Sequence, residues 1–177
     1  MAFELTEEQK MIQAMARDFA RTELLPTAAE RDQTKEFPRE NFLKMGELGL
    51  MGMMVPEQYN GAGVDMVSYA LALMEIAYAC ASTAVVMSVH NSIVCEAVKQ
   101  YGSDYLKENH LTRLATGEII GAFALTEPNA GSDPVRQSTT AVRSGSDYII
   151  NGTKRFITTG LNAGLTIATV VTDKTLK

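Results

Sequence analysis

The chain has 177 residues, enough for one ordinary domain or for one domain and part of another. Apolar residues make up 46% and charged residues 21%, a composition that excludes an intrinsically disordered chain. The formal net charge of −5 argues against nucleic acid or an anionic membrane as the main partner.

The cysteines and the N-terminus point to a reducing compartment. Cys80 and Cys95 form no pair with redox or metal-ligating spacing, so we expect two free thiols. The first residues lack both the apolar core of a signal peptide and the Arg-rich bias of a transit peptide. The longest uncharged apolar stretch, residues 76–89, is too short to span a bilayer. We therefore expect a cytoplasmic protein with no membrane partner.

The first helix is marked by a capping box. Thr6 can accept a hydrogen bond from the backbone of Gln9, whose side chain reaches back to Thr6. Apolar residues follow at helical spacing, and Pro26 is expected to end the helix. The polar residues 28–36 are predicted either as a short helix or as a loop.

Four further helical signals follow in the chain. Pro38 is expected at the start of a helix that Gly49 ends, and Asp65 is expected to cap the next one. Ser82 or Thr83 is the expected cap of a helix that runs to about residue 101. Ser103, finally, is expected to cap a helix that ends at Gly117. Between the helix that ends at Gly49 and the helix capped by Asp65, residues 51–63 carry Gly and Pro and are predicted as an extended loop.

The hydrophobic period changes after residue 118. Short apolar or β-branched runs predict strands at residues 119–125, 139–142, 148–150 and 165–171. Asn151-Gly152 is the dipeptide expected to turn a β-hairpin. The predicted fold class is therefore α+β, with an all-helical domain at residues 1–118 and an incomplete antiparallel β-domain at residues 119–177.

The loop at residues 124–136, with the sequence ALTEPNAGSDPVR, is the most informative stretch of the chain. Its Pro, Asn, Gly, Ser and Asp residues are typical of a tight, irregular loop. Backbone N–H groups and hydroxyls in such a loop suit an anionic or polar ligand. On these residues alone, a surface turn without a ligand is an equal alternative.

Two segments carry a resemblance to a known family. Residues 124–136 resemble the first signature of the acyl-CoA dehydrogenase family of flavoproteins, and residues 151–160, NGTKRFITTG, resemble the second at the family's spacing. Arg136 departs from the signature, which usually ends in Gly. The resemblance covers the whole chain but not the whole family fold. The family's C-terminal helical bundle carries the catalytic Glu, much of the FAD site and the tetramer contacts, and it has no counterpart in these residues.

The resemblance implies an FAD-dependent oxidoreductase. Such enzymes desaturate the α,β bond of acyl-CoA thioesters, short-chain ones here, in fatty acid or branched-chain amino acid breakdown. In the family a carboxylate takes the α proton and the flavin takes the β hydride. The homotetramer passes electrons to an electron-transferring flavoprotein. Since no carboxylate here aligns with the base, the isolated chain is expected to be inactive. The alternatives are a non-catalytic helical interaction module and an acyl-CoA oxidase-type relative.

Carried over position by position, the first signature implies five cofactor-binding residues. Phe123, Leu125 and Thr126 are expected along the flavin ring. Gly131 and Ser132 are expected at the cofactor's diphosphate, and Ser132 also resembles a residue that binds the acyl-CoA substrate. Without the resemblance, the two apolar residues are more often core, and Gly131 could serve only a turn that needs a positive φ.

The second signature implies that Phe156 packs on the flavin, where many relatives have Trp, and that Thr158 lies beside the flavin N5. Other polar residues are expected to be structural. Glu127 is predicted to be an exposed loop acid without a catalytic role. His90 and His110 are predicted to be surface or hydrogen-bonded core histidines rather than catalysts.

Overall fold

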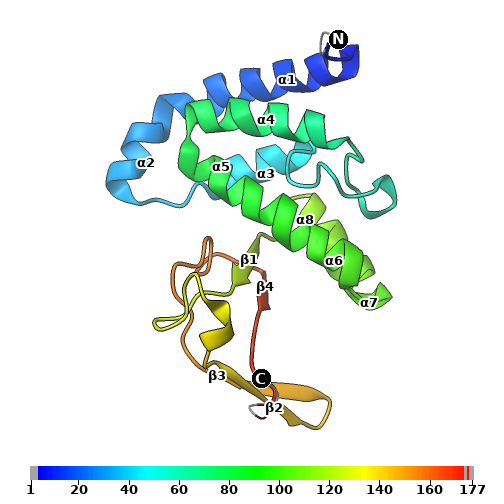
Figure 1. Ribbon diagram of the computed structural model, residues 1–177. Coiled ribbons are helices and arrows are strands. Elements are labelled where there is room, and N and C mark those ends of the chain that lie inside the picture. The colour runs from blue at the N-terminus through cyan, green and yellow to red at the C-terminus, as the bar shows by residue number, and fades with distance from the viewer. Residues whose placement is uncertain (1–3, 174, 176–177) are drawn as a thin grey trace.

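The structure is a computed structural model that describes residues 4–173 and residue 175. A helical N-terminal part is followed by a smaller β region, which lies on one side of the helices (Figure 1). The helices are α1 (Glu7–Phe19), α2 (Ala28–Thr34), α3 (Arg39–Glu47), α4 (Met66–Ala79), α5 (Ala81–Ser88), α6 (Glu96–Tyr101), α7 (Asp104–Leu106) and α8 (Thr112–Ala115). The strands are β1 (Gly121–Ala124), β2 (Thr140–Ser144), β3 (Asp147–Asn151) and β4 (Leu165–Ala168). The α+β prediction is confirmed.

The capping box at the start of α1 is confirmed. The Thr6 hydroxyl accepts from the Gln9 amide at 3.2 Å, and the Thr6 amide donates to the Gln9 side chain at 3.1 Å. The prediction that Pro26 ends this helix is wrong. The helical backbone continues through a π-helical segment and a 3₁₀ turn into α2, and Pro26 lies near the start of that turn, where no backbone N–H is needed.

The expected signals around α3 and α4 are largely confirmed. Pro38 directly precedes α3, and Gly49 follows it with φ 74°, the left-handed conformation of a helix C-terminal stop. The segment 51–63 is irregular apart from a 3₁₀ turn at Glu57–Tyr59. The Asp65 carboxylate caps α4 by accepting from the amides of the second and third residues beyond it, at 2.7 and 3.0 Å.

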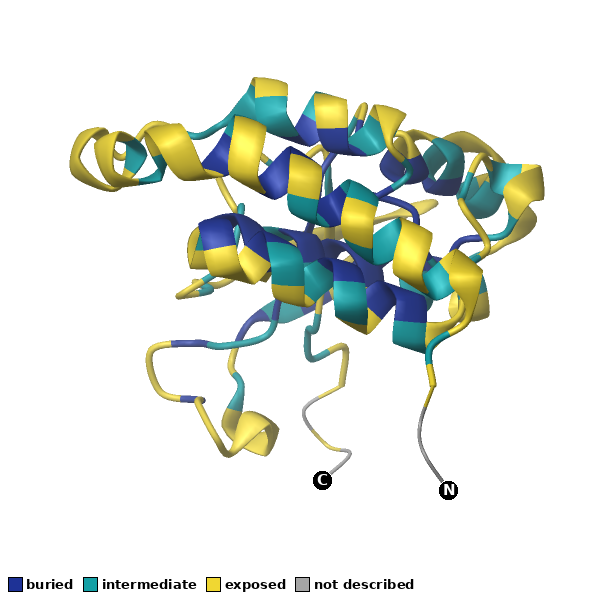
Figure 2. Cartoon of the chain, turned by 90° about the horizontal axis from the view of Figure 1, so that it is seen from above, coloured by how far each residue is buried: buried dark blue, intermediate teal, exposed yellow. Residues whose placement is uncertain are grey.

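The next helix has 21 residues. It runs without interruption from Ala81 to Tyr101, through α5, a π-helical segment and α6, and it begins at Cys80 rather than at a Ser or Thr cap. Its length and composition alone would allow it to cross a membrane, but 44% of its apolar window is buried inside the protein. A core helix of a globular protein meets the same criteria. We interpret it as such a helix, because Ala84, Met87 and Val94 are buried in core clusters. Figure 2 shows how buried and exposed residues alternate along the helices.

The buried side chains form two clusters. The larger one joins α1, α3, α4 and α5, with Phe42, Met45 and Ile76 at its centre. The second one lies between α6, α8 and the segments that flank them, and the partly buried Phe123 of β1 and Ile167 of β4 pack against it. The second cluster therefore fixes the start of the β region against the helical part. The domain boundary near residue 118 itself stays a prediction.

His90 connects the two parts by hydrogen bonds. The ring is fully buried; Nδ1 accepts from the Gly121 amide at 3.0 Å, and Nε2 lies 3.0 Å from the Leu114 carbonyl oxygen. Because Nδ1 accepts, the proton of the neutral ring must sit on Nε2, which donates to Leu114. His90 is thus a hydrogen-bonded core histidine. Burial lowers the pKa of His90 to about 4.

The strands form two separate two-stranded sheets in the described chain. β2 and β3 are antiparallel, as predicted, but β1 and β4 are parallel, with Phe123 beside Ile167. The prediction that Asn151-Gly152 turns the hairpin is wrong, because the turn is Gly145-Ser146, with Gly145 at φ 64°. Gly152 serves close packing instead, since a Cβ there would overlap the Thr139 side chain.

The burial of His90 predicts a specific pH dependence of stability. The unfolded ring titrates near 6.5 and the folded ring near 4, so the unfolded state binds the proton first as the pH falls. Stability is therefore lost between about pH 6.5 and 4, by about 3 kcal/mol from this residue. Urea unfolding should show a flatter pH profile in His90→Gln than in the wild type, whereas His110→Gln is the control for loss of a histidine elsewhere. Parallel profiles for wild type and His90→Gln would contradict this account.

Candidate functional site

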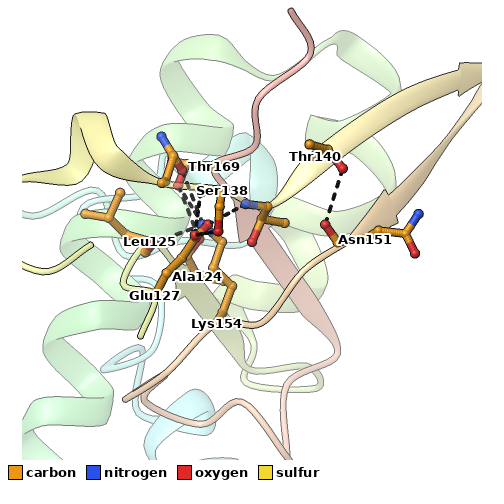
Figure 3. A network of polar contacts seen from close by, with 10 residues as sticks. Ala124, Leu125, Glu127, Ser138, Thr140, Asn151, Lys154 and Thr169 are labelled. Carbon is orange, nitrogen blue, oxygen red and sulfur yellow. Dashed lines mark hydrogen bonds and ion pairs between the residues drawn. The ribbon is translucent and has the colours of Figure 1, made fainter. Parts of the chain in front are cut away.

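A buried ion pair connects the two sequence motifs. Glu127 follows β1, and its carboxylate lies 2.8 Å from the Lys154 ammonium (Figure 3). Only 4% of the Glu127 surface is exposed, so the prediction of an exposed loop acid is wrong. The same ammonium also donates to the Leu125 carbonyl oxygen at 2.9 Å and lies within 3.4 Å of side-chain oxygens of Gln137 and Thr169. One side chain therefore holds several segments of the β region.

The Glu127 carboxylate accepts three further hydrogen bonds. Ser138 donates its amide at 2.5 Å and its hydroxyl at 2.9 Å, and Thr139 donates its amide at 3.0 Å. Burial by itself raises the pKa of this carboxyl, but the hydrogen bonds from Lys154, Thr139 and Ser138 outweigh burial and hold the pKa well below its ordinary value. Every contact stabilises the ionised form, and this supports a structural role for Glu127.

The residues of the first motif occupy a strand end and an exposed loop. Phe123 lies on β1 and packs partly against the second core cluster, whereas Leu125 and Thr126 follow the strand and are half-buried. Glu127 to residue 130 then form a tight turn, closed by hydrogen bonds of 2.9 and 3.2 Å in the two directions. Gly131 and Ser132 follow directly and are exposed.

The second motif holds an exposed aromatic ring in an unusual backbone conformation. Phe156 is 84% exposed and has φ 57°, and the Arg155 guanidinium lies 4.9 Å from its ring centroid. Thr158 is half-buried. Thr159 also has a positive φ, 62°, and its hydroxyl donates to the Gly121 carbonyl oxygen at 2.9 Å. Positive φ at residues other than Gly is uncommon, and such conformations cluster at ligand-binding sites.

The residues of the first motif that follow β1 lie beside the second motif. The Arg155 amide donates to the Thr126 carbonyl oxygen at 2.8 Å, next to the Lys154 contact with Leu125. Thr126 and Phe156 therefore belong to one surface. Among the described residues, no hydrogen bond joins residues 128–136, which include Gly131 and Ser132, to the second motif.

Three of the residues expected to bind the cofactor carry hydrogen-bond donors that have no partner in the described chain. Within residues 4–173, neither the amide nor the hydroxyl of Thr126, Ser132 or Thr158 donates a hydrogen bond. Amides and hydroxyls are the donors that the acceptor atoms of an isoalloxazine edge and of a diphosphate require. Of these donors, those of Thr126 lie near the exposed Phe156 ring through the Arg155–Thr126 hydrogen bond, and donors of this kind suit a flavin nucleotide.

Gly131 has no reason within the chain to be glycine. Its φ lies outside the left-handed region, so the alternative of a positive-φ turn is wrong, and a Cβ added there would meet no atom within 4 Å. An open position of this kind leaves room for the close approach of a ligand. Arg136, the departure from the first signature, lies exposed at the end of a 3₁₀ turn.

Sequence reasoning missed Lys154 and Thr159 as organising residues. Lys154 and Glu127 lie 27 residues apart, and no local spacing links a lysine in one motif with a carboxylate in another. The positive φ of Thr159 could not be predicted from the sequence, because threonine has no preference for that conformation.

The family descriptions that match are "Acyl-CoA dehydrogenase, N-terminal domain" over residues 6–118 and "Acyl-CoA dehydrogenase, middle domain" over residues 122–177. The chain belongs to the acyl-CoA dehydrogenase family. The short-chain specific acyl-CoA dehydrogenase of Clostridium acetobutylicum is 45% identical over 175 residues, which are 99% of this chain and 46% of that relative.

Solved structures give the same result. Butyryl-CoA dehydrogenase from Megasphaera elsdenii matches with a TM-score of 0.92 and 37% identity, over 99% of this chain and 47% of that one. A glutaryl-CoA dehydrogenase from Mycobacterium smegmatis in complex with FADH2 matches with a TM-score of 0.91 and 38% identity, over 96% and 44%. The chain thus spans less than half the length of these relatives.

Removing one partner of the buried pair should cost more stability than removing both. Lys154→Met leaves the Glu127 carboxylate buried without its cation, whereas the double variant with Glu127→Gln leaves no buried charge. We expect the melting temperature to fall by several degrees in Lys154→Met and to recover partly in the double variant.

Thermal melts at pH 7 measure both effects. Lys44→Met, which removes a more exposed pair with Glu23, is the control and should change the melting temperature little. The contribution of the pair to stability should begin to decline as the pH falls below about 4.5, because the unfolded carboxyl then takes up protons while the folded carboxylate, with its lowered pKa, is still ionised. Additive losses at pH 7 would show that the pair does not act as a unit.

Proposed function

We propose that the chain forms one wall of the flavin and acyl-CoA site of an FAD-dependent acyl-CoA dehydrogenase acting on short acyl thioesters. The observation that carries this proposal is the joining of the two motifs, through the Arg155–Thr126 hydrogen bond and the Lys154–Glu127 ion pair. These contacts hold an exposed aromatic ring beside hydrogen-bond donors that have no partner in the described chain.

Each residue of this wall has a task that its chemistry suits. Phe156 offers an aromatic face for stacking, and Thr126 offers an amide and a hydroxyl to the polar edge of the isoalloxazine. The Thr158 hydroxyl would donate a hydrogen bond at the reactive edge of the flavin. Gly131 and Ser132 admit and bind the diphosphate, and Ser132 also meets the thioester substrate. The bound flavin supplies the oxidising chemistry; these residues orient it.

The relatives support the finer points of the proposal. One is named as short-chain specific, another as a butyryl-CoA dehydrogenase, and a third is described with FADH2. From these names we extend FAD as cofactor and a short acyl-CoA as substrate to this chain. From the family resemblance we add an electron-transferring flavoprotein as acceptor and a homotetramer as the complete enzyme. The catalytic carboxylate belongs to the part of the family fold that these residues do not cover. The 177-residue chain is therefore inactive by itself, and we place it in the cytoplasm.

FAD titration tests the proposal. Quenching of flavin fluorescence should reveal weak binding to the 177-residue chain, and Phe156→Ala should weaken it about 3- to 10-fold through loss of the stacking face. Tyr101→Ala, which removes an aromatic ring of the same 84% exposure far from the motifs, is the matched control. No reduction of an electron-accepting dye is expected with butyryl-CoA. Absence of any flavin binding would favour the helical interaction module.

Gly131→Ala should separate binding from folding. The added methyl group meets no atom of the chain and the φ suits alanine, so the melting temperature should stay the same or rise slightly. FAD binding should nevertheless weaken several-fold, because the methyl group occupies space proposed for the diphosphate. Gly152→Ala is the contrasting variant, since its methyl group overlaps Thr139 and should lower the melting temperature. Unchanged FAD affinity in Gly131→Ala would place the diphosphate elsewhere.

A further inference from the structure

Gly121, the first residue of β1, contacts both the long helix and the second motif. Its amide donates to Nδ1 of His90 at 3.0 Å, and its carbonyl oxygen accepts from the Thr159 hydroxyl at 2.9 Å. A Cβ added to Gly121 would lie 2.4 Å from a methyl carbon of Val94, so only glycine lets the strand approach the helix this closely. β1 therefore begins directly against the helix that carries His90 (Figure 1).

The loop formed by residues 156–164 is attached to the start of β1. The Gly164 amide donates to the Ile120 carbonyl oxygen at 2.9 Å and fixes the end of the loop. Nearer its beginning, the Thr159 hydroxyl makes the contact with Gly121 and also lies 2.5 Å from the carbonyl oxygen of Thr158. The position of the loop thus depends on where Gly121 lies.

His90 in turn sets the position of Gly121. Gly121 is buried, and a buried amide without an acceptor is costly, so its N–H must follow the acceptor that the ring provides. We propose that His90 is a positioning residue of the flavin site. Through Gly121 and Thr159 it holds the loop that presents the Phe156 ring to the flavin. This inference rests on the proposed function, which makes that ring a stacking face for FAD.

Two amide side chains at position 90 separate the two hydrogen bonds of the ring. The oxygen of Asn can take the place of Nδ1 and accept from Gly121, whereas the nitrogen of Gln can take the place of Nε2 and donate to Leu114. His90→Asn therefore keeps the contact with Gly121, and His90→Gln loses it. Each variant loses one of two hydrogen bonds, so the two should lower the melting temperature by similar amounts.

Flavin titration of these variants tests the positioning role. FAD affinity should fall about 3- to 10-fold in His90→Gln and stay within about 2-fold of the wild type in His90→Asn. Equal affinities in the two variants would overturn the proposal, while flavin binding by the wild type would still support the proposed function.

Substitutions at Thr159 test the other end of the same connection without changing the helical core. Thr159→Val removes the hydroxyl and keeps the branched shape, so it should weaken FAD binding as His90→Gln does, whereas Thr159→Ser should not. The double variant of His90→Gln and Thr159→Val should bind FAD no more weakly than the weaker single variant, because both changes break one chain of contacts. Fully additive losses would show that the two residues act separately.

A fluorescent reporter follows the loop in the absence of FAD. The chain has no tryptophan, so Phe156→Trp introduces a single indole at the ring position. Its fluorescence anisotropy should fall when His90→Gln is added and should not change with His90→Asn. This pattern in a chain that binds no FAD would support the connection and refute the flavin site. An anisotropy that His90→Gln leaves unchanged would refute the connection even where FAD binds.

Discussion

The buried ion pair of Lys154 and Glu127 is the contact on which the β region depends. The strands form only two-stranded pairs in the described chain, and few apolar side chains are buried among them. Two-stranded units of this size are marginal without other support. A lysine that reaches a carboxylate, the Leu125 carbonyl and two side-chain oxygens supplies that support with directed contacts, since hydrophobic burial is small.

His90 stabilises the connection between the helical part and β1 by directed hydrogen bonds in the same way. The helix that carries it is packed by apolar side chains, but the chain must leave α8 and enter β1 with its backbone groups satisfied. The neutral ring accepts from the Gly121 amide and donates to the Leu114 carbonyl oxygen, which also accepts from the Gly117 amide. The position of β1, and with it the first motif, therefore follows from a side chain of the helical part.

Local signals in the sequence predicted the helices better than the β region. Thr6, Asp65 and Ser103 cap their helices as expected because capping depends on neighbouring residues alone. The hairpin turn predicted at Asn151-Gly152 is wrong, because Gly152 packs closely against the Thr139 side chain. This contact across the fold outweighs the turn preference of the dipeptide. The exposure of Phe156 and the absence of a neighbour at Gly131 agree with the site inferred from the motifs. The burial of Glu127 could not be foreseen, since it depends on a lysine 27 residues away.

The candidate site combines a strained residue with rigid neighbours on both sides. A positive φ at an aromatic residue costs on the order of 1–3 kcal/mol, and an exposed ring recovers little of it through packing. Phe156 keeps this conformation because Lys154 and the Arg155 amide fix the chain before it, and Thr159 fixes the chain after it by its bond to Gly121. These contacts all reach back to β1 or to the residues that follow it. The ring is therefore held in this conformation by contacts with the same strand that carries the first motif, so the two motifs are joined in one structural unit.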